Sequence, residues 1–257
     1  MSKYKIGCGL IIYGSRQNTD LPGVLAELAA AGYDGIEAGN LNNGDRTPDE
    51  IKSLLASHNL ELAGVHTGYG TIEQFDETIR FTEAMGSDYL MVSGVGGQDT
   101  LEDYQRSAEV FNEVGRRCSD AGIKFCYHNH SWEFKDFDGT TGLVALYEST
   151  DPQLVHACVD TYWVQHGGED PAAFLKQYAD RVAYLHFKDM NPDGSFGEVG
   201  HGILDWAGIM EAVSGINAEW LTVEQDRTDK TPKESATMSC QYIRQTLGIY
   251  CSRGQVS

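Results

Sequence analysis

Four residues of types that bind metal ions each end a short apolar run in the second half of the chain. They are His128, Asp160, His186 and Glu224. The successive gaps are 32, 26 and 38 residues, and a strand with its return helix needs about 30 or more residues. Each run is therefore predicted to be one strand of a parallel sheet. Because a barrel of parallel strands carries its active site at the carboxyl ends of the strands, we expect these side chains to converge.

Two imidazoles and two carboxylates can bind one divalent cation at about 2.0–2.2 Å from each ligand atom. The mixed nitrogen and oxygen set favours Mn²⁺ or Zn²⁺, with Co²⁺ and Fe²⁺ also suitable, over Mg²⁺, which prefers oxygen. Each residue alone also has a structural interpretation. Asp160 could cap a short helix that begins at Thr161. Glu224 could pair with Arg227, and His186 could be a hydrogen-bonded core residue. The joint pattern favours the metal site, because the predicted barrel independently places all four residues at the carboxyl ends of neighbouring strands.

Further polar residues close or follow other predicted strands. Glu37 ends the second strand-like run and His66 ends the third, so both are expected to bind substrate in a polar pocket. The alternative is that these side chains point into solvent. Glu133 lies just past the cluster His128-Asn129-His130 and could reach the pocket as a catalytic residue.

The segment after the seventh predicted strand is longer than a usual connection. Residues 188–202 include Lys188, Glu198 and His201, and long loops in compact domains are often functional. Lys188 and Glu198 are predicted to bind substrate, with Lys188 placed to stabilise an oxyanion or phosphate, and His201 is a candidate acid or base. A solvated hairpin is the alternative. The chain has no Walker pattern and no Gly-x-Gly-x-x-Gly turn between a strand and a helix.

Apolar runs alternate with amphipathic helical patterns over the whole chain. The predicted strands lie near 5–10, 34–38, 60–66, 88–93, 123–128, 155–160, 181–187 and 219–224. The predicted helices lie near 20–31, 47–57, 71–85, 101–120, 141–149, 171–179, 205–213 and 232–247. This alternation predicts a single-domain α/β protein with a (β/α)8 TIM barrel at 1–250 and a tail at 251–257. An open doubly wound sheet is the alternative, but it usually has a glycine-rich turn after its first strand.

The composition excludes several classes of protein. The net charge of −19 disfavours binding to nucleic acid, which requires a basic surface. No stretch approaches the roughly 20 apolar residues that span a bilayer, and the start of the chain lacks a signal-peptide pattern. We therefore expect a cytoplasmic protein that has no membrane partner. A homo-oligomer is compatible with this composition. The six cysteines contain no Cys-x-x-Cys pair, which predicts reduced, packed thiols.

Several motifs together resemble the sugar phosphate isomerase/epimerase family, which has a xylose isomerase-like TIM barrel. They are YHNHSWEF at 127–134, VDTYW at 159–163, LHFKD at 185–189, EVGHG at 198–202 and VE at 223–224, with GIE at 35–37 and VH at 65–66. The resemblance implies one divalent metal held by Glu, Asp, His and Glu from the fifth to eighth strands. Asp160, His186 and Glu224 match the last three positions. His128 stands where many members have Glu, and inosose dehydratase-like members also have a His-rich segment there.

These observations predict a metal-dependent isomerase or epimerase that acts on a sugar, sugar phosphate or keto-sugar. A metal bound to the substrate carbonyl would favour loss of the neighbouring proton, with Glu224 as the base. His128, Glu133 or His201 could then return the proton. A lyase or dehydratase of a ketosugar or inosose, using the same enolate chemistry, is the alternative. An apurinic-site endonuclease is disfavoured by the acidic charge, and a protein that only binds a sugar stays possible.

Overall fold

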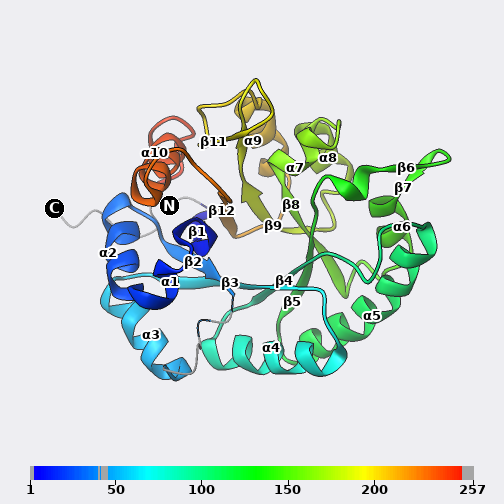
Figure 1. The fold of residues 1–257 in the computed structure, drawn as a ribbon, viewed down its shortest axis with the longest axis horizontal. Helices are drawn as coiled ribbons and strands as arrows, with labels where there is room; N and C mark the ends of the chain where they lie inside the picture. Colours follow the sequence, from blue (N-terminus) through cyan, green and yellow to red (C-terminus); the bar gives the residue numbers. More distant parts are fainter. Residues whose placement is uncertain (1–2, 40, 42–45, 251–257) are drawn as a thin grey trace.

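Eight parallel strands close into a barrel in the computed structural model, which describes residues 3–39, 41 and 46–250 (Figure 1). The strands are β1 (Lys5–Gly9), β2 (Gly35–Ala38), β3 (Glu61–Gly68), β4 (Tyr89–Ser93), β5 (Lys124–His128), β8 (Val155–Asp160), β9 (Val182–Phe187) and β12 (Trp220–Val223). Their order around the barrel is β1-β12-β9-β8-β5-β4-β3-β2, with β1 closing on both β12 and β2. The predicted TIM barrel is confirmed, and all eight strands lie where the apolar runs were.

One main helix follows each barrel strand, and Figure 1 shows these helices around the outside of the strands. They are α2 (Leu21–Ala31), α3 (Pro48–Ser57), α4 (Ile72–Met85), α5 (Leu101–Asp120), α6 (Gly142–Glu148), α8 (Pro171–Gln177), α9 (Trp206–Ser214) and α10 (Pro232–Gln245). Threonine caps define several starts: Thr47, Thr71, Thr100 and Thr231 each form a capping box. Such caps satisfy backbone N–H groups that the first helical turn leaves free.

The core has two parts, as expected for a barrel inside a ring of helices. The large part lies between the strands and the helices. A smaller cluster includes Met91, Tyr184 and Trp220. Gly35 is required beside this cluster, because a Cβ there would lie 2.7 Å from a ring carbon of Trp220. Side chains therefore fill the barrel interior, as in other TIM barrels, whose active sites lie at the carboxyl ends of the strands.

Short elements decorate the connections, and most follow the carboxyl ends of barrel strands. They are η1 (Leu10–Tyr13), α1 (Arg16–Thr19), η2 (Trp132–Phe134), α7 (Thr161–His166), the strand pair β6 (Asp136–Phe137) and β7 (Thr140–Thr141), and the strand pair β10 (Asp189–Met190) and β11 (Phe196–Gly197). Of these short elements, the sequence predicted only α7, as the helix that Asp160 would cap in its alternative role. The others were not predicted, because segments this short have no measurable periodicity.

The remaining sequence predictions concern the cysteines, the tail and membrane association. The five cysteines in the described ranges form no disulfide, and all five are buried, as predicted for packed thiols. Cys251 and the predicted tail at 251–257 lie outside the described residues. No helix of the described ranges is both long enough and apolar enough to span a membrane.

Candidate active site

The structure brings His128, Asp160, His186 and Glu224 together at the carboxyl end of the barrel. One ligand atom of each residue lies within 4.8 Å of those of the other three, and all four side chains are buried. His128 Nε2 is 3.4 Å from Asp160 Oδ2 and 3.8 Å from Glu224 Oε2. The strand register explains the convergence, because Asp160 on β8 lies opposite His186 on β9. The expected convergence is confirmed, and metal binding by these residues stays a prediction.

The hydrogen bonding of this cluster fits a cation. His186 Nδ1 lies 2.5 Å from Glu224 Oε2, yet among the described residues it makes no bond with hydrogen-bond geometry. Buried polar atoms are usually paired, so the unpaired His186 Nδ1, which faces Glu224, points to a missing ligand. The donor set itself, two imidazoles and two carboxylates, suits Mn²⁺ or Zn²⁺.

Glu37 orients His186 from behind. Its Oε2 lies 2.7 Å from His186 Nε2, which leaves Nδ1 facing Glu224. Its other oxygen lies 2.9 Å from His66 Nδ1, and His66 Nε2 contacts Ser93 Oγ at 3.1 Å. Glu37, His66, His186 and Glu224 also form a compact set of metal-ligand types. Hydrogen bonds already link Glu37 to both imidazoles, so the set with His128 and Asp160 is the better metal candidate.

Burial and neighbouring charges shift the protonation of these groups in opposite directions. Burial lowers the pKa of His128 well below its usual value, so the ring is neutral, as a metal ligand must be. Burial raises the pKa of Asp160 to about 6, against the opposing effect of Lys188. Burial alone would also raise the pKa of Glu224, but His186, Lys188 and His128 hold it well below its usual range. Glu224 is therefore a carboxylate at neutral pH.

Lys188 is fully buried among carboxylates. Its Nζ lies 3.3 Å from Glu224 Oε1 and 3.7 Å from Asp160 Oδ2, and it forms an ion pair with Asp226. Burial would lower the pKa of this amine, but Asp160, Glu224 and Asp226 raise it above its usual value. A permanent positive charge is thus held beside the candidate metal ligands.

A cavity of about 370 Å³ lies over this cluster and is called the inner cavity below. The ionisable side chains that line it come from several strands and from the segment after β12: Glu37, His66, His128, His130, Glu224 and Asp226. Glu37 is buried and His66 half-buried, so neither side chain points freely into solvent. Both predicted substrate-binding residues therefore lie at the cavity.

The structure does not bring Glu133 or His201 to the inner cavity, contrary to their predicted catalytic positions. The turn η2 directs Glu133 behind the barrel wall, where Tyr127 Oη donates to Oε1 at 2.6 Å and the His130 N–H donates to Oε2 at 2.9 Å. Burial raises the pKa of this carboxyl to about 7. His201 is exposed. Glu198 accepts hydrogen bonds from Thr228 and Lys230, so it orders the segment after β12 instead of lining the inner cavity.

Asp189, which the sequence analysis did not single out, organises the long 188–202 segment. Its carboxylate accepts bonds from the backbone N–H groups of Gly200, Gly202 and Leu204 and from Trp206 Nε1. The segment therefore contains a hairpin, β10–β11, but these hydrogen bonds fix it and it is not the free, solvated hairpin of the alternative. The signal for Asp189 in the sequence is an acid two residues after a buried strand.

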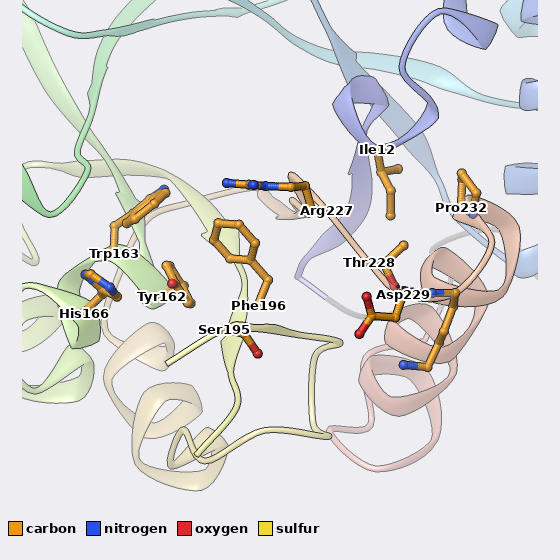
Figure 2. Close-up of a pocket in the computed structure, with 11 residues that line it drawn as sticks. Ile12, Tyr162, Trp163, His166, Ser195, Phe196, Arg227, Thr228, Asp229 and Pro232 are labelled. Atoms are coloured by element: carbon orange, nitrogen blue, oxygen red, sulfur yellow. Dashed lines mark hydrogen bonds between the residues drawn. The ribbon is translucent and has the colours of Figure 1, made fainter. Parts of the chain in front are cut away.

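A second cavity of about 850 Å³ lies beside the first and is called the outer cavity (Figure 2). Its walls come from α7, from the β10–β11 hairpin, from the segment after β12 and from η1. No strand-end pattern predicted it.

Residues 25–246 match the family described as xylose isomerase-like TIM barrel. The chain belongs to that family. The resemblance that the sequence motifs indicated is confirmed. The chain is 28% identical to an inosose dehydratase of Clostridium botulinum, over 88% of this chain and 89% of the relative. It is 27% identical to the inosose dehydratase of Geobacillus kaustophilus, over 95% and 94% of the two chains.

Solved structures share this fold. A sugar phosphate isomerase/epimerase from Parabacteroides distasonis superposes with a TM-score of 0.83 at 24% identity, over 97% of this chain and 96% of the other. The IOLI protein, solved with a bound zinc atom, superposes with a TM-score of 0.76 at 16% identity, over 97% and 100%. At these identities the likeness shows the fold alone.

Proposed function

We propose that the chain is a divalent-metal-dependent lyase that removes a leaving group from a polyhydroxylated ketone such as an inosose or ketosugar. The observation that carries the proposal is the buried cluster of His128, Asp160, His186 and Glu224 beneath the inner cavity. Similarity to inosose dehydratases over nearly the full length supports the reaction class. Elimination also agrees with His128, since epimerases of this family use a carboxylate at that position.

The metal would be held by His128, Asp160, His186 and Glu224, whose donors fit it. When bound, a divalent ion polarises the carbonyl oxygen and makes the neighbouring C–H bond more acidic. The solved IOLI protein with zinc supports a metal in this fold, and Mn²⁺ and Zn²⁺ are the ions that the ligand set favours.

Glu224 is the proposed base. Its carboxylate is ionised at neutral pH, lies at the inner cavity and contacts both imidazoles of the cluster, at 2.5 Å from His186 Nδ1 and 3.8 Å from His128 Nε2. It removes the proton from the carbon next to the carbonyl. The electron pair of that C–H bond forms a carbon–carbon double bond as the C–O bond at the next carbon breaks. General-base groups of this kind contribute about 10²–10⁴-fold to a rate.

Lys188 and His66 complete the proposed machinery. The buried ammonium of Lys188, 3.3 Å from Glu224, stabilises negative charge that develops on the substrate oxygen. His66 lines the inner cavity with its ring held by Glu37 and Ser93, so it is positioned to protonate the departing oxygen. Water or an alcohol then leaves, and the protons and electrons balance without any oxidant.

An isomerase or epimerase is the second candidate. The carboxylate of Glu37 also lines the inner cavity, and with Glu224 it could provide the two acidic groups that reversible proton transfer at two positions would require. Hydrogen bonds to His66 and His186 occupy Glu37, which favours elimination.

The test is incubation with keto-inositols, ketoses and their phosphates in deuterated water, with Mn²⁺ or Zn²⁺ supplied. We expect a product that is lighter by the leaving group and carries deuterium at the carbon that held this group, because the enol formed by elimination takes up a solvent proton there when it becomes a ketone. Deuterium incorporation with no loss of mass would support the isomerase. Binding of the ketones without any exchange would contradict both and leave a protein that only binds sugar. Chelator-treated protein is the control for metal dependence.

A further inference from the structure

The outer cavity is larger than the inner cavity and has a different chemical character. Aromatic rings of Tyr162, Trp163 and Phe196 form one side of it, and Figure 2 shows Arg227 extending from the segment after β12 towards Trp163. Phe196 lies between the rings of α7 and the opposite wall at Thr228. The outer cavity therefore combines aromatic rings on one side with polar and charged side chains elsewhere in its wall.

The two cavities are neighbours along the chain as well as in space. Ile11 lines the inner cavity and Ile12 the outer one, and Asp226 and Arg227 are divided in the same way. Lys188 is buried between them. Its Nζ contacts carboxylates that line the inner cavity and lies 4.8 Å from the ring centre of Trp163 on the outer side. One molecule that extends past this residue would contact both cavities.

The charges of the outer cavity favour a neutral, hydroxylated ligand. Among the described residues, the Arg227 and Asp229 side chains have no hydrogen-bond or ion-pair partner, although both line the cavity. The Lys230 ammonium is neutralised by Glu198 at 2.8 Å. An unpaired cation and an unpaired anion in the same cavity do not select a phosphate, but both can bind hydroxyl groups. Aromatic faces add stacking for a ring.

We propose that the outer cavity binds a ring carried on the leaving oxygen, so that the preferred substrate is a glycoside-like ketone and not a free keto-sugar. This inference rests on the proposed lyase function. The ketone-bearing ring occupies the inner cavity, and a sugar or aryl ring attached through oxygen occupies the outer one. Loss of the proton next to the carbonyl forms the double bond, the C–O bond breaks, and the leaving oxygen takes a proton to depart as an alcohol.

The substrates that test this inference differ only in the leaving group. Glucosides oxidised at carbon 3 carry the leaving oxygen on carbon 1, which is two bonds from the carbonyl carbon. The methyl form has no second ring, the benzyl form has an aryl ring, and the glucosyl form has a second sugar ring. Methoxide and benzyloxide are similarly basic, so they are similarly good leaving groups. A higher kcat/KM for the benzyl form than for the methyl form therefore reports binding of the ring and not leaving ability.

We expect kcat/KM for the benzyl or glucosyl form to exceed that for the methyl form by about tenfold or more, since tenfold corresponds to about 1.4 kcal/mol, the scale of one aromatic contact. Trp163→Ala and Arg227→Ala should each lower this ratio towards one. Arg227 is exposed, so its variant should fold even if Trp163→Ala does not. Arg106→Ala, which removes another exposed arginine on α5, is the matched control and should keep the wild-type ratio. The stronger of the benzyl and glucosyl forms identifies the kind of ring.

Binding of benzyl β-glucoside, which has no ketone and cannot react, separates this inference from the proposed function. Saturation-transfer NMR should show contact to the benzyl protons that weakens in Trp163→Ala and Arg227→Ala. Exchange of substrate protons combined with equal kcat/KM for all three glucosides would overturn the outer site while keeping the lyase. Ring binding without any proton exchange would keep the site and overturn the lyase. Absence of both ring binding and ring preference would overturn the inference itself.

Discussion

The inner and outer cavities lie side by side but are built in different ways. The four candidate metal ligands beneath the inner cavity lie at the ends of barrel strands, and they are buried and held by neighbouring charges. The walls of the outer cavity come from α7, β11 and the segment after β12, where Arg227 and Asp229 are exposed and unpaired among the described residues. The contrast indicates that the strands position the reacting groups, whereas the connections select what is bound.

This contrast has a consequence for mutagenesis. A change at the inner cavity should affect every substrate, because all must react at the same cluster. A change at the outer cavity should alter the ratio between substrates. Lys188, which lies between the cavities, should affect the protein most broadly.

Glu224→Gln should produce the largest effect. The amide cannot accept the substrate proton, so we expect kcat to fall by about 10³-fold or more. The fall should be the same for substrates with and without a ring on the leaving oxygen. The measurement is deuterium exchange into the substrate, with metal content determined on the same sample. Glu211→Gln, at an exposed glutamate on α9, is the control. Activity near that of the wild type in Glu224→Gln would remove this residue as the base and weaken the distinction between the cavities.

Lys188→Met should destabilise the metal-free protein. Loss of the ammonium leaves Asp160, Glu224 and Asp226 without their shared buried cation, and breaking a buried ion pair costs about 3–5 kcal/mol. Urea unfolding measures the free energy, and excess Mn²⁺ should recover part of it by binding the folded protein. Lys176→Met, on the surface of α8, is the matched control. Equal stability of the two variants would show that the cluster does not depend on this charge.

Glu133→Gln tests a buried carboxyl that belongs to neither cavity. Its pKa in the folded protein is about 7, against an ordinary value of 4.5, so the folded state holds this proton more tightly than the unfolded chain. Wild-type stability should therefore fall, relative to the variant, by about 3 kcal/mol as the pH rises from about 4.5 to 7. Urea unfolding of both proteins at several pH values measures the difference. A difference that does not change with pH would contradict the raised pKa.

Glu37→Gln should have the smallest of these effects. The charge that orients His186 through Nε2 would be lost, and such outer partners of metal ligands typically contribute about 10–100-fold to metal affinity. Competition with a coloured chelator measures the Mn²⁺ or Zn²⁺ affinity, again with Glu211→Gln as the control. An unchanged affinity would indicate that Glu37 serves the substrate and not the ligand.

Regular features of the chain were readable before any coordinates. The eight apolar runs with intervening helical patterns predicted the barrel, because strand and helix periods repeat over lengths that a sequence displays. The same register predicted the meeting of Asp160 and His186, since parallel strands end at a common edge. Asp160 also caps α7 by accepting from the Trp163 N–H, so its two proposed roles are compatible.

Residues beyond the strand ends depended on the path of each connection. Glu133 follows its strand by five positions and turns behind the barrel, whereas Asp226 follows β12 by three and turns into the inner cavity. Nothing in their local sequence distinguishes these directions, because each depends on contacts with distant segments, such as Tyr127 for one and Lys188 for the other. Residue type and spacing therefore determined the barrel and its cluster of ligand-type groups. Long-range packing of irregular backbone, which has no period in the sequence, decided the outer cavity and which acids of the connections face the inner one.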